Sequence, residues 1–277
     1  MAVPSSLFAT VGFRNLRVFA LDANGYMAAT TATTAYEGIR VTKNKVLTIT
    51  HPEARLIIHH GDDRIFALDT LPPTEPLTGE VTLANFNLDF DALVGNVKVV
   101  TQNEAKMILV ASDQQGFEPL VGLFAYQQGV DVDDTGSTYG GRRWHFAMLP
   151  QAWVIKRMPP MNENPANPMY TVRPQFVTKY LTGSAFASAT EGATQAQLVH
   201  GIVNYKPKLV SWLSATTGDA FYPFPTAYPA VLGTTAGIPI VCDGPTLKAA
   251  GVTYSTTGVT LASSTIGNIV SCMYETS

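Results

Sequence analysis

The chain has 277 residues, of which 46% are hydrophobic and only 14% charged, and its formal net charge is −3 at pH 7. Proteins dedicated to duplex binding neutralise phosphates with Lys and Arg, so this charge balance argues against that class. The charged share lies well below the usual value of about 25%. This deficit indicates a protein that hides much of its surface in an assembly or against a partner.

The length allows one large domain or two smaller ones. Cys242 and Cys272 are too few for a secreted disulfide framework, and we expect both to be free, half-buried strand residues. Arg14 and Arg17 follow the first small apolar stretch instead of preceding it, unlike a secretory leader. The apolar runs are shorter than the roughly 20 residues that a membrane helix needs. We therefore expect a cytoplasm-like compartment and no membrane partner.

The first half of the chain is typical of short strands separated by turns. Residues 16–22 predict a strand that enters a hairpin turn at Asn24-Gly25. Residues 46–60 predict extended chain interrupted at Pro52, and residues 97–113 predict two short strands about a polar turn. This spacing of strands and turns favours a sandwich or barrel.

Two segments favour helix. Residues 87–96 have acids early, an apolar set and Gly95 as a stop, which predicts one short helix. Residues 193–202 carry a weaker helical pattern.

The second half returns to strands. Residues 142–157 alternate over Trp144, Phe146 and Met148, break at Pro150 and resume at Trp153. Further strands are predicted in residues 173–183 and, about turns at Asp243-Gly244 and Thr257-Gly258, in residues 238–276. We place a domain boundary near residues 205–210, which gives a β domain with extended loops in residues 1–207 and a small β-sandwich module in residues 208–277.

Two proline-rich stretches, residues 70–80 and 158–170, predict long excursions from the core. Loops of this length are uncommon inside compact domains and are usually functional. Proline stiffens them, which suits arms that dock on a neighbour.

The stretch "IIHHGDD" has the side chains of a metallohydrolase site: His59, His60, Asp62 and Asp63. Consecutive strand residues point to opposite faces, so the two histidines would need a bulge to share an ion. The segment is better interpreted as a strand that enters an acidic turn. No nucleophile elbow, phosphate-binding loop, dinucleotide fingerprint or H-E-x-x-H pattern occurs. We predict no enzyme activity, no metal and no cofactor.

Charge is segregated along the chain. Acids dominate residues 60–91 and bases dominate residues 137–180. Such stretches either meet across a subunit contact and fix its register or are ordinary solvated loops. Arg142 and Arg143 lie beside Trp144, and Arg and Trp together favour an interface anchor over a nucleic-acid site.

The order of these segments resembles the tail tube (major tail) proteins of long-tailed bacteriophages. The resemblance covers roughly residues 10 to 185 and rests on "VGFRNLRVFALDANGYMA", "VLTITHPEARLIIHHGDD", "LDFDALVGN", "RRWHFAMLPQAWVIKR" and "VTKYLTG". The C-terminal segment with "VCDGPTLKAAGVTYSTTGVTL" is similar to the small Ig-like β-sandwich modules that decorate many phage virion proteins.

The resemblance implies a mainly β fold, a β-sandwich or half-barrel flanked by one α-helix. It implies homo-oligomeric rings, hexameric in that family, that stack through extended loops and bind other tail and connector proteins. Double-stranded DNA would pass through the lumen without specific binding. The location would be the virion tail, after assembly in the host cytoplasm.

Two sets of residues follow as candidates from the resemblance and the charge pattern. The candidates for the lumen or for contacts between rings are acidic: Asp62, Asp63, Asp69 and Glu75. The candidates for the subunit interface are Arg142, Arg143, Trp144 and Arg157.

Other functions stay open at this stage. The chain could be another virion component, such as a capsid decoration or adaptor protein. It could also be a carbohydrate-binding β-sandwich that uses Trp144, Trp153 or Trp212.

Overall fold

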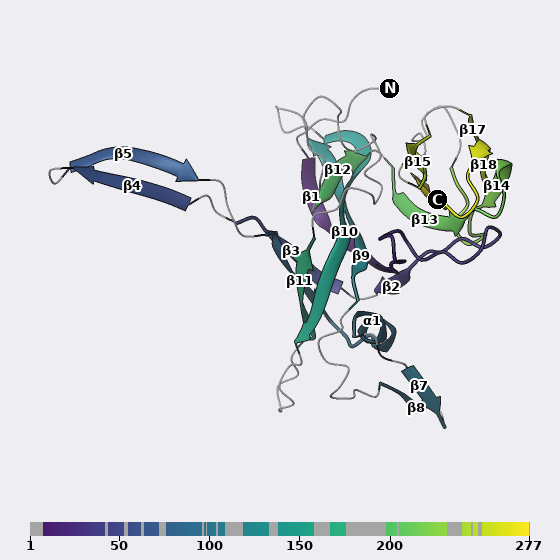
Figure 1. Cartoon of the computed structure of the whole chain (residues 1–277), viewed down its shortest axis with the longest axis horizontal. Helices are drawn as coiled ribbons and strands as arrows, with labels where there is room; N and C mark the ends of the chain where they lie inside the picture. Colours follow the sequence, from purple (N-terminus) through teal and green to yellow (C-terminus); the bar gives the residue numbers. More distant parts are fainter. Residues whose placement is uncertain are drawn as a thin grey trace.

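The structure is a computed structural model and describes residues 8–41, 44–52, 55–61, 64–71, 76–95, 97, 99–103, 105–108, 119–132, 138–157, 167–175, 198–203, 205–231, 240–244, 246–248 and 251–276. In some strand segments, including residues 55–61, 64–71 and 138–143, only the backbone is described. The described chain is mainly β, in antiparallel sheets with one helix (Figure 1). This confirms the predicted fold class of a β-sandwich with one flanking helix.

The largest sheet has eight strands in the hydrogen-bonded order β2-β1-β9-β10-β11-β6-β3, and β12 also pairs with β10. Strands β12 and β11 pair with different stretches of β10, residues 144–148 and 152–157 respectively. The sheet curls, because β3 contacts β1 although they lie far apart in the strand order. The bounds are β1 (Phe8–Ala20), β2 (Ile39–Val41), β3 (Asn44–Thr50), β6 (Thr78–Leu83), β9 (Val121–Val132), β10 (Thr138–Arg157), β11 (Met169–Pro174) and β12 (Val199–Val203).

Each face of this sheet packs against a different core. One face, inside the curl, buries the first cluster together with the helix: Leu16, Val18, Val41, Val81, Leu83, Phe90, Val94, Val121, Leu123, Ala125, Leu149, Ala152, Val154, Tyr170 and Val172. The other face buries a second cluster against the C-terminal sheets: Phe19, Met27, Phe124, Tyr126, Trp144, Phe146, Met148, Val199, Leu209, Cys242 and Met273. The alternation of side chains along each strand produces this two-sided burial.

The predicted helix is present as α1 (Leu88–Val94). The Asn87 side chain accepts a hydrogen bond from the Phe90 backbone N–H at 3.1 Å, which caps the first turn. Gly95 ends the helix, and its N–H donates to the carbonyl of Asp91. The signals read from residues 87–96 therefore act as predicted.

Most of the predicted turns are confirmed. Gly25 has a positive φ of 82°, and the bridge between Leu21 and Met27 closes the hairpin around it. Strands β7 (Val99–Gln102) and β8 (Ala105–Ile108) form the hairpin predicted in residues 97–113. The interruption at Pro52 separates β3 from β4 (Arg55–Gly61), which pairs with β5 (Arg64–Leu71).

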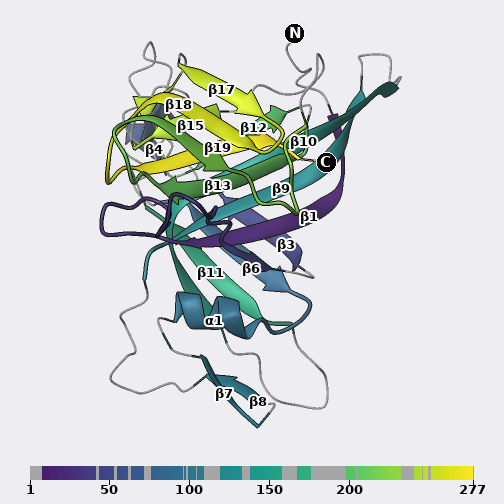
Figure 2. The same cartoon turned by 90° about the vertical axis from the view of Figure 1, so that its right-hand side faces the viewer.

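The remaining strands form two sheets at the C-terminal end, β13-β19-β15-β16 and β14-β18-β17. A third cluster, which includes Trp212, Tyr222, Phe224 and Tyr274, is buried between them. The strands lie close together beside β9 and β10 in both views (Figures 1 and 2). Their bounds are β13 (Pro207–Leu213), β14 (Gly218–Pro223), β15 (Ile240–Asp243), β16 (Thr246–Leu247), β17 (Val252–Ser255), β18 (Gly258–Ser264) and β19 (Ile269–Glu275).

The second helix prediction was wrong where the structure describes it. Residues 199–203 form β12 and pair with Trp144 to Met148 of β10. A Cβ atom at Gly201 would lie 3.0 Å from the ring of Phe146, so the glycine admits this close strand contact. Other predictions concerned residues 176–183 and 193–197, which lie outside the described residues.

Candidate subunit interface

The hairpin of β4 and β5 extends away from the rest of the described chain (Figure 1). Among the described strands these two pair only with each other, so they form a separate two-stranded sheet. Apolar residues occupy both strands, for example Ile58 opposite Leu68. A lone two-stranded hairpin is marginally stable in water. The hairpin is therefore a strong candidate for a segment that is completed by a partner.

His59, His60 and Gly61 of the "HHGDD" stretch are the last residues of β4. His59 and His60 are consecutive residues of β4, opposite Ala67 and Ile65. The pairing register shifts by one residue between His59 and His60, and the extra residue, Phe66, lies on β5. The bulge is therefore in β5, and β4 itself has none. Asp69 lies on β5 opposite Ile57. Asp62, Asp63 and Glu75 lie outside the described residues, so the acidic turn stays a prediction.

A second feature is an exposed sheet face on β10, β11, β6 and β3, here called the Trp153 face. The strand registers place every second residue of these four strands on this face. They are Trp153, Ile155 and Arg157 of β10, Met169, Thr171 and Arg173 of β11, Thr78, Glu80 and Thr82 of β6, and Val46, Thr48 and Thr50 of β3. Trp153 is 42% exposed and Val46 is 48% exposed. Arg157 and Arg173 are also exposed. The face mixes apolar, hydroxyl and cationic side chains with one carboxylate, that of Glu80, as interfaces do.

A shift in strand register explains why Trp153 is exposed. Trp144, Phe146 and Met148 point toward the C-terminal sheets and are buried there. The irregularity between Leu149 and Ala152 shifts by one residue which side chains of β10 point to each face of the sheet. Trp153 therefore lies on the same face as Met148, but beyond the part of that face that the C-terminal sheets cover. The sequence break at Pro150 was the visible signal for this shift.

The predicted interface residues separate in the structure. Trp144 is only 9% exposed and packs edge-on against Tyr126, with ring centroids 5.5 Å apart. Its prediction as an interface anchor needs correction, because its own chain covers it. Arg157 is exposed at the end of β10. Arg142 and Arg143 pair through their backbones with Val130 and Gly129, and their side chains lie outside the described part.

Some charges of the two segregated stretches meet within the chain. The carboxylate of Asp91, in α1, is buried and accepts hydrogen bonds from Lys156 Nζ at 2.6 Å and from the Tyr170 hydroxyl at 2.7 Å. Burial and the Asp91 carboxylate raise the pKa of Tyr170 far above its usual value. At the surface, Lys106 pairs with Asp89 at 2.6 Å. The buried Asp91 contacts anchor α1, whereas the exposed Lys106 pair adds little. Arg157 and Arg173 are exposed.

A polar cluster fastens the C-terminal sheets to the large sheet. Glu37, in the connection between β1 and β2, pairs with Arg17 of β1 at 3.3 Å and with Lys208 of β13. Lys208 Nζ also lies 3.7 Å from the centroid of the Tyr228 ring. The same connection pairs with β13 through backbone hydrogen bonds in both directions between Tyr36 and Ser211. The segment from β1 to β2 thus acts as an additional edge of the C-terminal sheets.

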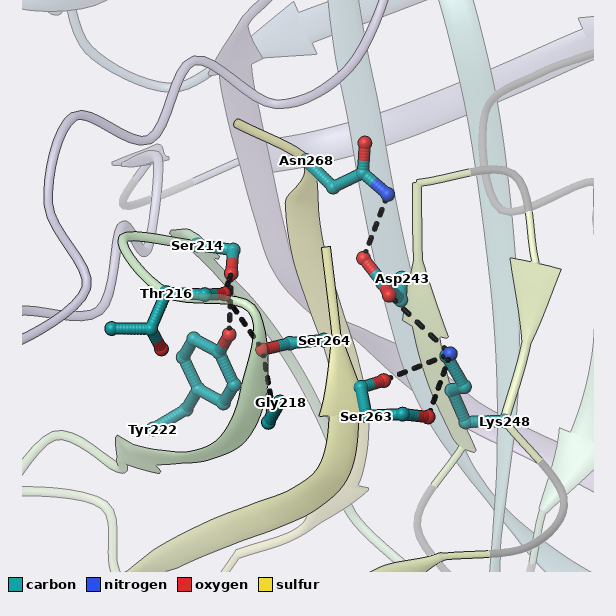
Figure 3. Close-up of polar contacts among 9 residues, drawn as sticks. All are labelled: Ser214, Thr216, Gly218, Tyr222, Asp243, Lys248, Ser263, Ser264 and Asn268. Carbon is teal, nitrogen blue, oxygen red and sulfur yellow. Dashed lines mark hydrogen bonds and ion pairs between the residues drawn. The ribbon is translucent and has the colours of Figure 1, made fainter. Parts of the chain in front are cut away.

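Polar contacts within the C-terminal sheets are structural. The buried Asp243 accepts from Asn268 Nδ2 at 2.9 Å and lies 3.4 Å from Lys248 Nζ, which donates to the Ser263 carbonyl (Figure 3). A second group ties the β13–β14 turn to β18 through Ser264, whose hydroxyl donates to the Thr216 and Gly218 carbonyls. All these partners belong to adjoining strands and turns, so we assign no chemistry to them.

The aromatic residues of the carbohydrate-binding alternative are mostly buried. Trp212 is fully buried in the C-terminal core, and its Nε1 donates to the Pro223 carbonyl at 3.0 Å. With Trp144 also buried, Trp153 is the tryptophan left at the surface. A single exposed tryptophan does not favour that alternative.

Within the described ranges, no group of three or more His, Cys, Asp or Glu side chains is placed to hold a metal ion. No helix in the same ranges is long and apolar enough to cross a membrane. Cys242 and Cys272 are free, as predicted, and buried more completely than expected.

No protein family, curated protein or solved structure matches this chain. The assignment of a function therefore rests on the physical features of the chain itself.

Proposed function

We propose that this protein is the subunit of a phage tail tube, a structural protein that assembles into stacked rings, and not an enzyme. The observation that carries the proposal is the hairpin of β4 and β5, which projects from the body and pairs with no other described strand. An isolated two-stranded sheet with open edges is a liability in a soluble monomer. Docking on another copy would pair or cover those edges.

The open edges of the large sheet support the same proposal. In the described residues the sheet ends at β2 on one side and at β3 on the other, and β12 adds a further short edge. Exposed edges invite pairing with another chain. Joining the sheets of neighbouring subunits around a ring would pair these edges. The surface buried in such a ring would also account for a charged share of only 14%.

The Trp153 face supplies a surface that suits the acidic hairpin of a neighbour. Its exposed cations are Arg173, directly opposite Trp153 on β11, and Arg157, which follows Ile155 on the same face of β10. In sequence the hairpin carries three acids, Asp62, Asp63 and Asp69, against two arginines, Arg55 and Arg64. Opposite charges of this kind fix the register between subunits. We therefore propose that the hairpin of one subunit contacts the Trp153 face of another.

A charge-exchange experiment tests this contact. Asp62→Lys with Asp63→Lys should reduce assembly, measured by sedimentation velocity, and so should Arg157→Glu with Arg173→Glu. An equal mixture of the two variants should recover assembly, because each supplies the partner that the other lacks. Lys106→Glu, which changes an exposed cation elsewhere, serves as the control and should assemble normally. Normal assembly of both double variants would exclude the proposed contact.

A second experiment separates folding from assembly. Replacing residues 55–71 with a short Gly-Ser linker removes a sheet that pairs only with itself. The melting temperature should stay close to that of the intact protein while stacked particles disappear. A variant that still stacks like the intact protein would show that the hairpin is not the stacking element.

A further inference from the structure

Two histidines lie side by side on the inner face of the large sheet, near its β12 edge. His145 of β10 lies opposite Ile202, and His200 of β12 lies opposite Ala147, so the two imidazoles form a diagonal pair across adjacent strands. Their ring centroids are 5.8 Å apart with an interplanar angle of 77°. Neither residue takes part in the hairpin or the Trp153 face.

After one ring turns out of this edge-to-face contact, the separation suits two imidazoles that share one ion. Each Zn–N bond is about 2 Å long, so two imidazoles on one tetrahedral ion place their centroids roughly 5 to 6 Å apart. The pair is reachable, since His200 is exposed and His145 is partly buried. A metal can therefore enter from the His200 side.

A neighbouring amide orients His145. Gln127 lies directly opposite it on β9, with its side-chain nitrogen 3.1 Å from His145 Nδ1. Metal-binding histidines usually hold their second ring nitrogen in such a hydrogen bond. When Nε2 of His145 binds the ion, Nδ1 of His145 carries the proton. The side-chain amide of Gln127 then rotates so that its oxygen, instead of its nitrogen, faces Nδ1 and accepts the hydrogen bond.

The surroundings leave room for an ion. His145 lines a cavity of about 210 Å³, whose other walls include Leu47, Ile49 and Ala125. That volume accommodates an ion with its water ligands beside an apolar wall.

We propose that His145 and His200 form a two-histidine site for a late first-row divalent cation, with water completing the coordination shell and Gln127 positioning His145. Imidazole ligands suit Zn²⁺, Ni²⁺ and Cu²⁺, and affinity should rise toward Cu²⁺. The site does not depend on the proposed role in a tail tube.

Isothermal titration of the tag-free, full-length protein with NiCl₂ and with ZnCl₂ tests the site. His200→Ala, at an exposed position, should weaken binding at least about tenfold. His145→Gln should do the same, and its circular dichroism spectrum should match that of the parent protein. The matched control is His59→Ala with His60→Ala, which removes the other adjacent histidines and should leave the affinity unchanged.

Three results would overturn the proposal. The first is the absence of binding at about 1 mM metal, where even weak protein sites are occupied. The second is binding that survives His200→Ala but is lost in the His59/His60 variant. With Cu²⁺, electron paramagnetic resonance should show nitrogen ligands that His200→Ala reduces, and spectra unchanged by that substitution would also count against the site.

Discussion

Lys208 of β13 and Glu37 of the β1–β2 connection form an ion pair although 171 positions separate them in the sequence. Arg17 of β1 shares the same carboxylate. Lys208 and Arg17 are 4% and 5% exposed, so Glu37 compensates two buried cations at the contact between the large sheet and the C-terminal sheets. This cluster fastens the C-terminal sheets to the large sheet.

Glu37→Gln should destabilise the protein by about 3 kcal/mol, because it leaves both buried cations without a counter-charge. Urea denaturation at neutral pH measures the change in the free energy of unfolding. The control is Lys106→Gln, which breaks the exposed pair with Asp89 and should cost less than about 1 kcal/mol. Equal costs for the two variants would contradict the role given to Glu37.

Lys208 should make stability depend on alkaline pH. Burial lowers the pKa of Lys208 from 10.5 to about 8, against the opposing effect of its hydrogen bond with Glu37. Between these two values the unfolded lysine keeps a proton that the folded lysine has lost, so the free energy of unfolding rises with pH in this window.

Buried thiols and tyrosines, whose pKa values are raised, act in the opposite direction, so the comparison must be made against Lys208→Met. Urea denaturation measures the free energy of unfolding at pH 7.5 and at pH 9.5. Between these two values the free energy of unfolding should rise more, or fall less, in the parent protein than in Lys208→Met. The same pH response in both proteins would refute a lowered pKa for Lys208.

Asp91→Asn should destabilise the protein by about 2 to 3 kcal/mol, because Asp91 accepts hydrogen bonds from both Lys156 and Tyr170 in a buried site. Asp89→Asn, in the same helix but exposed, should cost less than about 1 kcal/mol. Thermal unfolding of the two variants makes the comparison. The reverse order of costs would mean that Asp91 does not anchor α1.

The thiols of Cys242 and Cys272 should be protected in the folded protein. Burial raises the pKa of both, that of Cys242 to about 11, so little thiolate is present at neutral pH. Their side chains also belong to different core clusters, which prevents a disulfide between them. Labelling with a thiol reagent should be more than about 100-fold slower in buffer than in denaturant, because it requires opening of the core. Rapid labelling of the native protein would contradict this packing.

Trp153 should be the tryptophan that acrylamide quenches, since Trp144 is 9% exposed and Trp212 is fully buried. Trp153→Phe should remove the readily quenched fluorescence, and Trp144→Phe should leave it. If the Trp153 face is a subunit contact, quenching of the parent protein should also fall as the concentration rises. Quenching that stays constant through assembly would place Trp153 outside the interface.

Local signals in the sequence were enough to predict much of the fold. Asn24-Gly25 specifies its hairpin, and Asn87 and Gly95 bound α1, because each acts within a few residues. The β12 strand was missed because its conformation depends on a distant contact, in which Gly201 admits Phe146 of β10. Long-range pairing overrides a weak local helical pattern.

The surface features were harder to predict for the same reason. Trp144 and Trp153 belong to one alternating stretch, yet the irregularity after Leu149 and the cover of the C-terminal sheets bury one and expose the other. The diagonal placement of His145 and His200 requires the register of β12 on β10, which no spacing along the chain reveals. Glu37 and Lys208 likewise meet only through packing of the sheets.

Negative-stain electron microscopy of the purified, concentrated protein tests the central proposal most directly. A tail tube subunit should form rings of uniform diameter that stack into hollow tubes, and the variant lacking residues 55–71 should not stack. A protein that stays monomeric at high concentration, with neither rings nor tubes in the images, would contradict the proposed function.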